Sequence, residues 1–217
     1  MFCGIDSIIF PDSCEVVEIV PSQLYAFPVF KNGSSSLLDR SNNWKVIQAS
    51  ALTNTQSPIV VFLRSPRERF ISGVNTYVQR TIQQHPELDE KTILWFVDQY
   101  LFLNRHFCPQ FFWLLNLARF TGPDVKLKLC DVGDIKNFTP MRIKPPMVED
   151  HKFQDSIDKF NWQQLELYMF LDQILTDRIG QELSLTEIFA IIKAQHPELY
   201  RLVFDKTIQL SNVLPKT

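Results

Sequence analysis

Residues 59–70 read IVVFLRSPRERF, and they decide what kind of fold the chain adopts. Residues 59–63 are all apolar and mostly β-branched, and Pro58 precedes them. A continuous apolar run of this length is typical of a strand that is covered on both faces, as in a parallel sheet. We therefore expect a buried strand here.

A helix is predicted to follow this strand directly. Ser65 is a good N-cap residue, Pro66 suits the first helical position, and Glu68 stands where a capping box has its acidic member. The pattern predicts a helix from Pro66 to about Gln84.

A second strand and a loop precede this unit. Residues 24–30 form a short apolar stretch bounded by Ser, which predicts a strand, and residues 15–20 form a similar stretch. Residues 31–36 read KNGSSS, and a helical pattern follows them to about Ser41. Strand, loop, helix and buried strand together make a βαβ unit.

The rest of the chain is mostly helical in pattern. Helices are expected at residues 90–104, 110–120, 162–179, 188–194 and 197–210, a strand at 125–130, a short turn or helix at 131–139, and an extended loop at 141–147. Ser184 and Glu187 form a second Ser-x-x-Glu capping box. These patterns predict an α/β fold with a short parallel sheet and a helical C-terminal part. We expect one domain over residues 1–217, with a core at about 24–175 and a helical extension at 176–217.

Composition and charge limit the functions that the chain can have. It has 217 residues, 45% of them hydrophobic and 21% charged, which is typical of a packed globular protein. A net charge of -2 argues against a broad surface for nucleic acid or an anionic membrane, so any anion site is local. The four cysteines show no metal-ligand spacing and are expected to be buried thiols. Neither a secretory signal nor a transmembrane segment is visible, so we expect a cytoplasmic protein.

The loop at residues 31–36 has the features of a phosphate-binding loop. It leaves the carboxyl end of a strand and enters a helix, so backbone N–H groups and the positive end of the helix dipole favour an anion there. Gly33 allows close approach, the three serines add hydroxyl donors, and Lys31 supplies a cation. It is not a Walker A loop, because the lysine precedes the glycine. The same residues also suit a Ser-capped turn with a solvated lysine.

A second group of cationic and hydroxyl residues follows the buried strand. Arg64 ends the strand, and Arg69 and Ser72 lie three apart on one face of the predicted helix. At 1.5 Å per residue, Ser72 lies about 12 Å along from Arg64, so both reach one anion only if the arginine lies back along the helix. A surface helix with solvated arginines is the alternative.

Together the two groups resemble the sulfotransferases that use 3'-phosphoadenosine 5'-phosphosulfate (PAPS), in particular the carbohydrate O-sulfotransferase-like branch. In that family the first loop holds the 5'-phosphosulfate, and the arginine and serine of the second motif hold the 3'-phosphate. The resemblance implies these donor-binding residues: Lys31, Asn32, Gly33, Ser34, Ser35, Ser36, Arg64, Arg69 and Ser72.

The resemblance covers about residues 25–175 and is weaker beyond the two motifs. LNRHFCPQ at residues 103–110, LCDVGDIKNF at 129–138, and His151 followed by LYMFLDQIL at 167–175 are similar to later family segments. Two departures stand out. Ser65 replaces the acidic residue that commonly follows the family's first arginine, and Asp39 is the only carboxylate or histidine between residues 37 and 63.

The resemblance implies a P-loop-like three-layer fold and a sulfuryl transfer from PAPS to an acceptor hydroxyl of a carbohydrate or other small molecule. Adenosine 3',5'-bisphosphate would be the product, with no metal and no nucleic acid involved. Lys31 would meet the leaving phosphate, and His106 or Asp39 would act as the general base. The alternative is an inactive nucleotide-binding module with a regulatory or scaffolding role. A kinase that uses ATP is disfavoured, because no Gly-Lys-Ser/Thr sequence is present.

Overall fold

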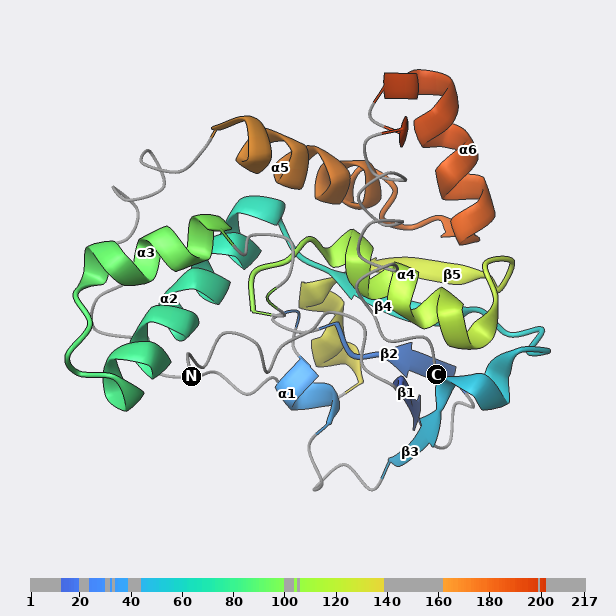
Figure 1. Ribbon diagram of the computed structural model, residues 1–217. Helices are drawn as coiled ribbons and strands as arrows, with labels where there is room; N and C mark the ends of the chain where they lie inside the picture. Colours follow the sequence, from blue (N-terminus) through green and yellow to red (C-terminus); the bar gives the residue numbers. More distant parts are fainter. Residues whose placement is uncertain are drawn as a thin grey trace, which may run out of the picture.

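A computed structural model describes residues 13–19, 24–29, 32, 34–38, 44–99, 104, 106–138, 162–198 and 200–201. These residues form a mixed α/β structure in which one open, six-stranded sheet is flanked by helices (Figure 1).

The sheet has a parallel centre and antiparallel edges. Its strand order is β3-β1-β2-β4-β5-β6. The strands are β1 (Glu15–Ile19), β2 (Leu24–Phe27), β3 (Lys45–Gln48), β4 (Ile59–Leu63), β5 (Leu127–Asp131) and β6 (Glu182–Leu183). β2 and β5 both run parallel to β4, whereas β1, β3 and β6 pair antiparallel with their neighbours. Because parallel strands end at the same edge, the carboxyl ends of β2, β4 and β5 lie side by side.

The buried strand predicted at residues 59–63 is confirmed. All five of its residues are buried, and it lies between two parallel neighbours. Ile59, Val61 and Leu63 contribute to the larger apolar cluster, while Val60 and Phe62 belong to the smaller one. Each such side chain contributes roughly 1.5–3 kcal/mol when it is fully buried. The strand has no polar face, so it requires cover on both sides.

Helices supply that cover. They are α1 (Ser34–Leu37), α2 (Pro66–Gln84), α3 (Glu90–Gln99), α4 (Gln110–Thr121), α5 (Trp162–Thr176) and α6 (Leu185–Gln195), with the 3₁₀ segments η2 (Ala49–Leu52) and η3 (Val132–Asn137). The larger cluster contains buried residues of α2 to α6, and the smaller one contains Leu37 of α1 and Ile135 of η3. The predicted bounds of α2 are confirmed at both ends.

The prediction of a short parallel sheet is confirmed for the central strands, whereas the outer strands pair antiparallel. The βαβ unit is present in that β2 and β4 are parallel neighbours, but β3 and η2 are inserted between α1 and β4. β3 pairs with β1 at the sheet edge, and its residues are all exposed except for the half-buried Ile47, so their burial does not alternate. Such a short edge strand gives little periodic signal.

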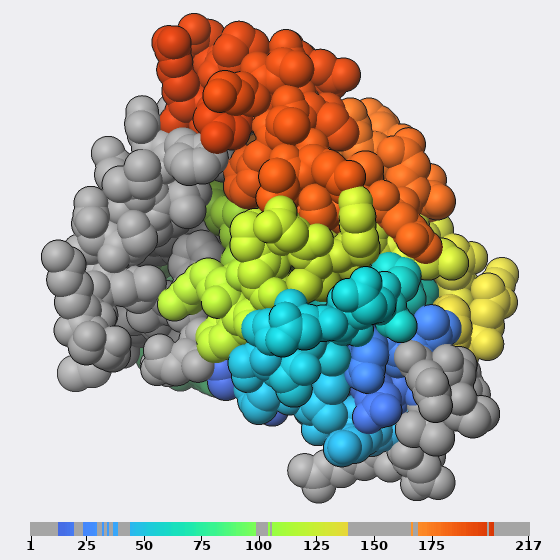
Figure 2. Space-filling view, turned by 90° about the vertical axis from the view of Figure 1, so that its right-hand side faces the viewer, coloured from blue at the N-terminus to red at the C-terminus, as the bar shows by residue number. Residues whose placement is uncertain are grey.

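The C-terminal part is not wholly helical either. β6 is a two-residue strand that pairs with β5, and Leu185, Ile188 and Ile192 of α6 are buried in the larger cluster. Figure 2 shows this segment, orange to red, seated on the yellow-green α4. Residues 182–192 therefore complete the same core. The predictions for residues 141–147 and 202–210 lie outside the described residues.

No helix in the described part of the chain is long and apolar enough to cross a membrane.

Candidate anion-binding site

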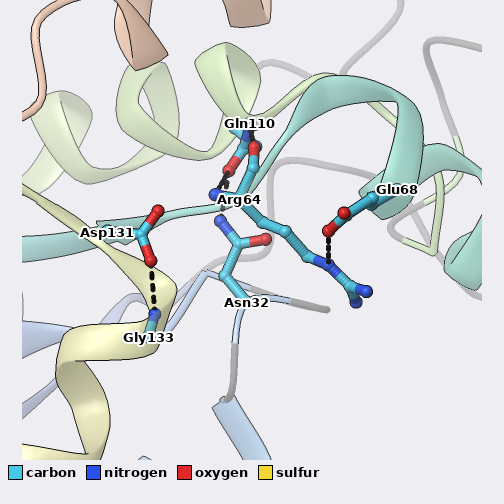
Figure 3. A network of polar contacts seen from close by, with 6 residues as sticks. All are labelled: Asn32, Arg64, Glu68, Gln110, Asp131 and Gly133. Carbon is cyan, nitrogen blue, oxygen red and sulfur yellow. Dashed lines mark hydrogen bonds and ion pairs between the residues drawn. The ribbon is translucent and has the colours of Figure 1, made fainter.

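The residues that follow β2, β4 and β5 meet at one edge of the sheet (Figure 3). Asn32 comes after β2, Arg64 follows β4 directly, and Asp131 is the last residue of β5 and lies opposite Leu63. The Asp131 carboxylate caps η3, since its Oδ1 accepts a hydrogen bond from the backbone N of Gly133 at 2.7 Å. In open α/β sheets, ligands bind outside the carboxyl ends of the strands.

Gln110, the first residue of α4, holds the end of β4 in place. Its Oε1 accepts from the backbone N of Arg64 at 2.9 Å, and its Nε2 donates to the backbone O of Arg64 at 2.9 Å. The amide thus pairs with the main chain of Arg64 as a neighbouring strand would. Gln110 is fully buried, so these bonds are shielded from water and strengthened by the low local dielectric.

Asn32 joins the loop after β2 to this arrangement. Its Nδ2 donates to the backbone O of Phe62 at 2.8 Å and also to Oε1 of Gln110. Its backbone N donates to the backbone O of Val29 at 3.1 Å. Every N–H of Asn32 is therefore in use, and its remaining polar atoms are acceptors.

This arrangement bears on the predicted role of Asn32. Asn32 was expected to bind the donor, yet it has no N–H left to give to a phosphate, and its side chain is 1% exposed. Asn32 instead ties its own position after β2 to the end of β4 and to the start of α4.

Asp172 of α5 sets the direction of the Gln110 amide. Its Oδ2 accepts from Nε2 of Gln110 at 3.1 Å, and its Oδ1 accepts from the backbone N of Phe111 at 3.2 Å. Burial raises the pKa of Asp172, while the charge of Arg69 and these hydrogen bonds act to lower it. The Gln110 side chain and the backbone N of Phe111 both donate hydrogen bonds to the Asp172 carboxyl group, so the geometry suits its ionised form. A carboxylate only accepts, so Nε2 of Gln110 has to face it and Oε1 has to face Asn32 and Arg64.

The Arg64 side chain points away from Gln110 and Asn32 and toward Glu68 (Figure 3). Its Nε contacts Oε2 of Glu68 at 3.2 Å, with side-chain exposures of 32% and 64%. Glu68 and Ser72 are four residues apart on one face of α2, so the guanidinium that contacts Glu68 lies at the face that carries Ser72. An exposed ion pair of this kind is worth only about 0.3–0.5 kcal/mol. The main chain of Arg64 is thus held firmly, whereas its guanidinium can exchange Glu68 for an anion.

The N-terminus of α2 lacks the capping box that the sequence predicted. Ser65 is the N-cap residue, but its side chain accepts no cap hydrogen bond. Glu68 is instead paired with Arg64. The first N–H groups of a helix carry the positive end of its dipole. This end of α2 lies where β4 ends and has no side-chain acceptor from Ser65, an arrangement suited to an anionic ligand.

Arg69 was also predicted to bind the donor, and its burial argues against direct contact. Its side chain is fully buried, and its Nη1 donates to the backbone O of Cys108. Burial raises the pKa of the Cys108 thiol to about 11 even beside this cation. Arg69 therefore connects α2 to the segment before α4 inside the core.

His106 is held away from the sheet edge. Its residue is 6% exposed, and its ring packs against Tyr77 with centroids 6.5 Å apart. Tyr77 lies eleven residues beyond Pro66 in α2, which is about 16 Å along the helix axis. The backbone of His106 packs against α2 at Gly73. A Cβ added to Gly73 would lie 2.1 Å from the backbone O of His106. The structure therefore does not bring His106 to the Arg64 end of α2.

The described residues include only part of the predicted phosphate loop. Ser34 is buried and begins α1, and Ser35 and Ser36 lie within that helix. Ser72 is half-buried on α2. Lys31, Gly33, Asp39 and His151 lie outside the described residues.

Sequence reasoning assigned no role to Gln110 and Asp172. Both stood in segments that resemble later family motifs, and those motifs were given no chemical role for either residue. A signal was present for Asp172, because it stands between Leu171 and Ile174 in an apolar helix and all three are buried. A carboxylate buried among apolar residues of a helix requires a buried partner.

No family model matches the chain, and neither a curated protein nor a solved structure matches it.

Proposed function

We propose that the protein is a sulfotransferase that moves a sulfuryl group from PAPS to an acceptor hydroxyl of a carbohydrate or other small molecule. One observation carries the proposal. Asn32 and Arg64 belong to the two predicted phosphate-binding motifs, 32 residues apart in sequence, and both bind the Gln110 amide. The two motifs therefore converge at one edge of the sheet, as a single ligand with two phosphate ends requires.

The two ends of the donor would occupy different elements. The 5'-phosphosulfate would bind at the loop that Asn32 fixes, using Lys31 and the backbone N–H groups from Gly33 to Ser36. The 3'-phosphate would bind Arg64 and Ser72 near the start of α2. Support for the second placement comes from the weak Glu68 contact of Arg64 and from the missing cap at Ser65.

The reaction is an in-line displacement at sulfur. The acceptor oxygen forms a bond to sulfur, the bond from sulfur to the 5'-phosphate oxygen breaks, and the acceptor proton passes to a base. The products are a sulfate ester and adenosine 3',5'-bisphosphate. Negative charge grows on the leaving phosphate oxygen, so Lys31 would stabilise the transition state more than the ground state. No step requires a metal.

The base is the open part of this mechanism. His106 packs on Tyr77, about three turns into α2, so it is a weaker candidate than its sequence context indicated. Asp39 remains a candidate. Because His106 lies away from the sheet edge, a second function is favoured. In it the protein is an inactive nucleotide-binding module that keeps both phosphate-binding motifs and serves regulation or scaffolding.

A binding panel and a transfer assay test the proposal. Adenosine 3',5'-bisphosphate at 100 times its Kd should raise the stability by roughly 2.7 kcal/mol, visible as a rise in Tm, whereas AMP at the same concentration should give a much smaller rise. Equal rises with the two nucleotides would contradict a 3'-phosphate site. Transfer from labelled PAPS to a panel of sugars then separates an enzyme from an inactive module. In an active protein, Lys31→Ala should lower turnover about 100- to 1,000-fold, and unchanged turnover would exclude Lys31 from the leaving group.

A further inference from the structure

We propose that Gln110 is a positioning residue. It holds the two phosphate-binding motifs, one at Asn32 and one at Arg64, at a fixed separation, so that the protein recognises a nucleotide 3',5'-bisphosphate as one unit. This inference rests on the proposed donor, but it concerns how the site is built. Gln110 itself would touch no ligand. It acts through Asn32 on one side and through the main chain of Arg64 on the other.

The contacts of Gln110 are arranged for this role. Its Oε1 accepts from both Asn32 Nδ2 and Arg64 N, so a single atom joins the loop after β2 to the end of β4. Its Nε2 donates to Arg64 O and to Asp172 Oδ2. All four hydrogen bonds of the amide are made, and the residue is fully buried. No side chain of another type offers two acceptor directions and two donor directions in a flat group, apart from the shorter Asn.

Asp172 makes the arrangement directional. If the amide rotated by 180°, its oxygen would face the Asp172 carboxylate and its NH₂ would face two N–H donors, at Asn32 and Arg64. Every contact would then be repulsive. Asp172 is anchored to α4 by the backbone N of Phe111, so α5 keeps the amide in the one orientation that joins the two motifs.

Fixed separation has a measurable consequence. When two parts of a ligand bind to two sites on a rigid frame, the second contact is intramolecular and its effective concentration is high. When the frame loosens, each part binds nearly as before, but the advantage of having both parts in one molecule falls. The loss of Gln110 should therefore weaken a bisphosphate far more than either monophosphate. A variant that is merely less well folded would weaken all three nucleotides alike.

The experiment measures three dissociation constants on the full chain by calorimetry, for adenosine 3',5'-bisphosphate, adenosine 3'-monophosphate and adenosine 5'-monophosphate. Gln110→Met keeps the side-chain length and removes all four hydrogen bonds. It should raise the Kd of the bisphosphate at least tenfold and that of each monophosphate less than threefold. The matched control is Gln173→Met, on the exposed side of α5, where the side-chain Nε2 donates to Oδ1 of Asp177. It should leave all three constants unchanged.

A second variant covers the case in which Gln110→Met does not fold. Asn32→Ala cuts the loop side of the connection and leaves the bonds of Gln110 to Arg64 and Asp172 in place. It should produce the same selective loss. Where both single variants fold, the double variant should lose no more than the larger single loss, because both changes break one connection.

The outcomes separate the two proposals. If the wild-type protein binds the bisphosphate no more tightly than the better monophosphate, the proposed function fails and the coupling with it. If the wild-type protein prefers the bisphosphate and both variants keep that preference in full, or lose affinity for all three nucleotides equally, the function stands and the positioning role of Gln110 is wrong.

Discussion

The helices α2 and α6 begin with the same sequence pattern, Ser-x-x-Glu, and only α6 forms the capping box. At α6, Oγ of Ser184 accepts from the backbone N of Glu187 at 3.2 Å, and Oε2 of Glu187 accepts from the backbone N of Ser184 at 2.6 Å. At α2, Ser65 makes no side-chain cap, and Glu68 turns to Arg64. The pattern fixes where each helix starts, but it does not decide how its first N–H groups are satisfied.

The neighbouring cation explains the difference. Lys126 binds the Glu187 carboxylate from outside, at 2.6 and 2.7 Å, and the carboxylate serves both the lysine and Ser184. Arg64 instead lies just before the N-cap of α2 and draws Glu68 away from it. The start of α6 is a closed capping box, formed by Ser184, Glu187 and Lys126. The other is open at the edge of the sheet where a ligand would bind, and natural sequences depart from local rules mostly at such sites.

The largest expected effect comes from removing the cation at the open helix start. Arg64→Ala should raise the Kd of adenosine 3',5'-bisphosphate by about 10- to 100-fold, because hydrogen bonds to a charged group are worth roughly 1.5–3 kcal/mol. Arg67→Ala, on the exposed side of the same first turn, is the matched control and should change Kd by less than threefold. Titration calorimetry measures both. Equal losses in the two variants would show that general positive charge, and not Arg64, holds the nucleotide.

The two caps themselves can be compared by stability. Ser184→Ala should lower the free energy of unfolding by about 1 kcal/mol, since it removes a formed N-cap bond. Ser65→Ala should change it by no more than about 0.5 kcal/mol, because no such bond is present there. Urea denaturation of the two variants, with the wild-type protein alongside, gives both values. Similar losses at the two positions would mean that Ser65 caps α2 in solution and that the open helix start is not a real feature.

These two helix starts also show what the sequence can and cannot predict. The apolar run at residues 59–63 and the bounds of α2 followed from local pattern, because burial on both faces and a proline at the first helical position leave few alternatives. The edge strand β3 and the two-residue β6 did not, because pairing with a neighbour, and not local propensity, makes them strands. For the site, the motif at Arg64 was visible, whereas the role of Gln110 was not. Its four contacts come from residues 32, 64 and 172, and no local pattern encodes contacts across such distances.

The contribution of the α6 capping box to the free energy of unfolding should depend on pH. Hydrogen bonds from Lys126 and from the backbone of Ser184 lower the pKa of Glu187 from its ordinary value of 4.5 to about 2. A lowered folded-state pKa adds stability that is fully present above about pH 4.5 and is lost as the pH falls toward 2. Glu187→Gln should remove this part of the pH dependence, so the free-energy difference between wild type and variant should shrink between pH 4.5 and 2. Lys126→Met should remove much of the same dependence. Urea denaturation at several pH values measures this free-energy difference. A difference that stays constant between pH 4.5 and 2 would contradict the titration of Glu187 in this range.

The smallest expected effect concerns the competitor at the open start. Glu68 occupies the guanidinium that the 3'-phosphate is proposed to use, and breaking that exposed pair costs the ligand about 0.3–0.5 kcal/mol. Glu68→Gln should therefore tighten the binding of adenosine 3',5'-bisphosphate about twofold, and the gain should shrink in high salt because salt screens exposed charges. Glu90→Gln, at the start of α3, removes the same charge away from Arg64 and controls for net charge. Adenosine 5'-monophosphate should show no gain from Glu68→Gln, since it has no group for Arg64. A gain of equal size for both nucleotides would mean that Glu68 acts through the overall electrostatic potential of the surface. Weaker binding of the bisphosphate would mean that Glu68 positions Arg64 for the ligand instead of competing with the ligand for it.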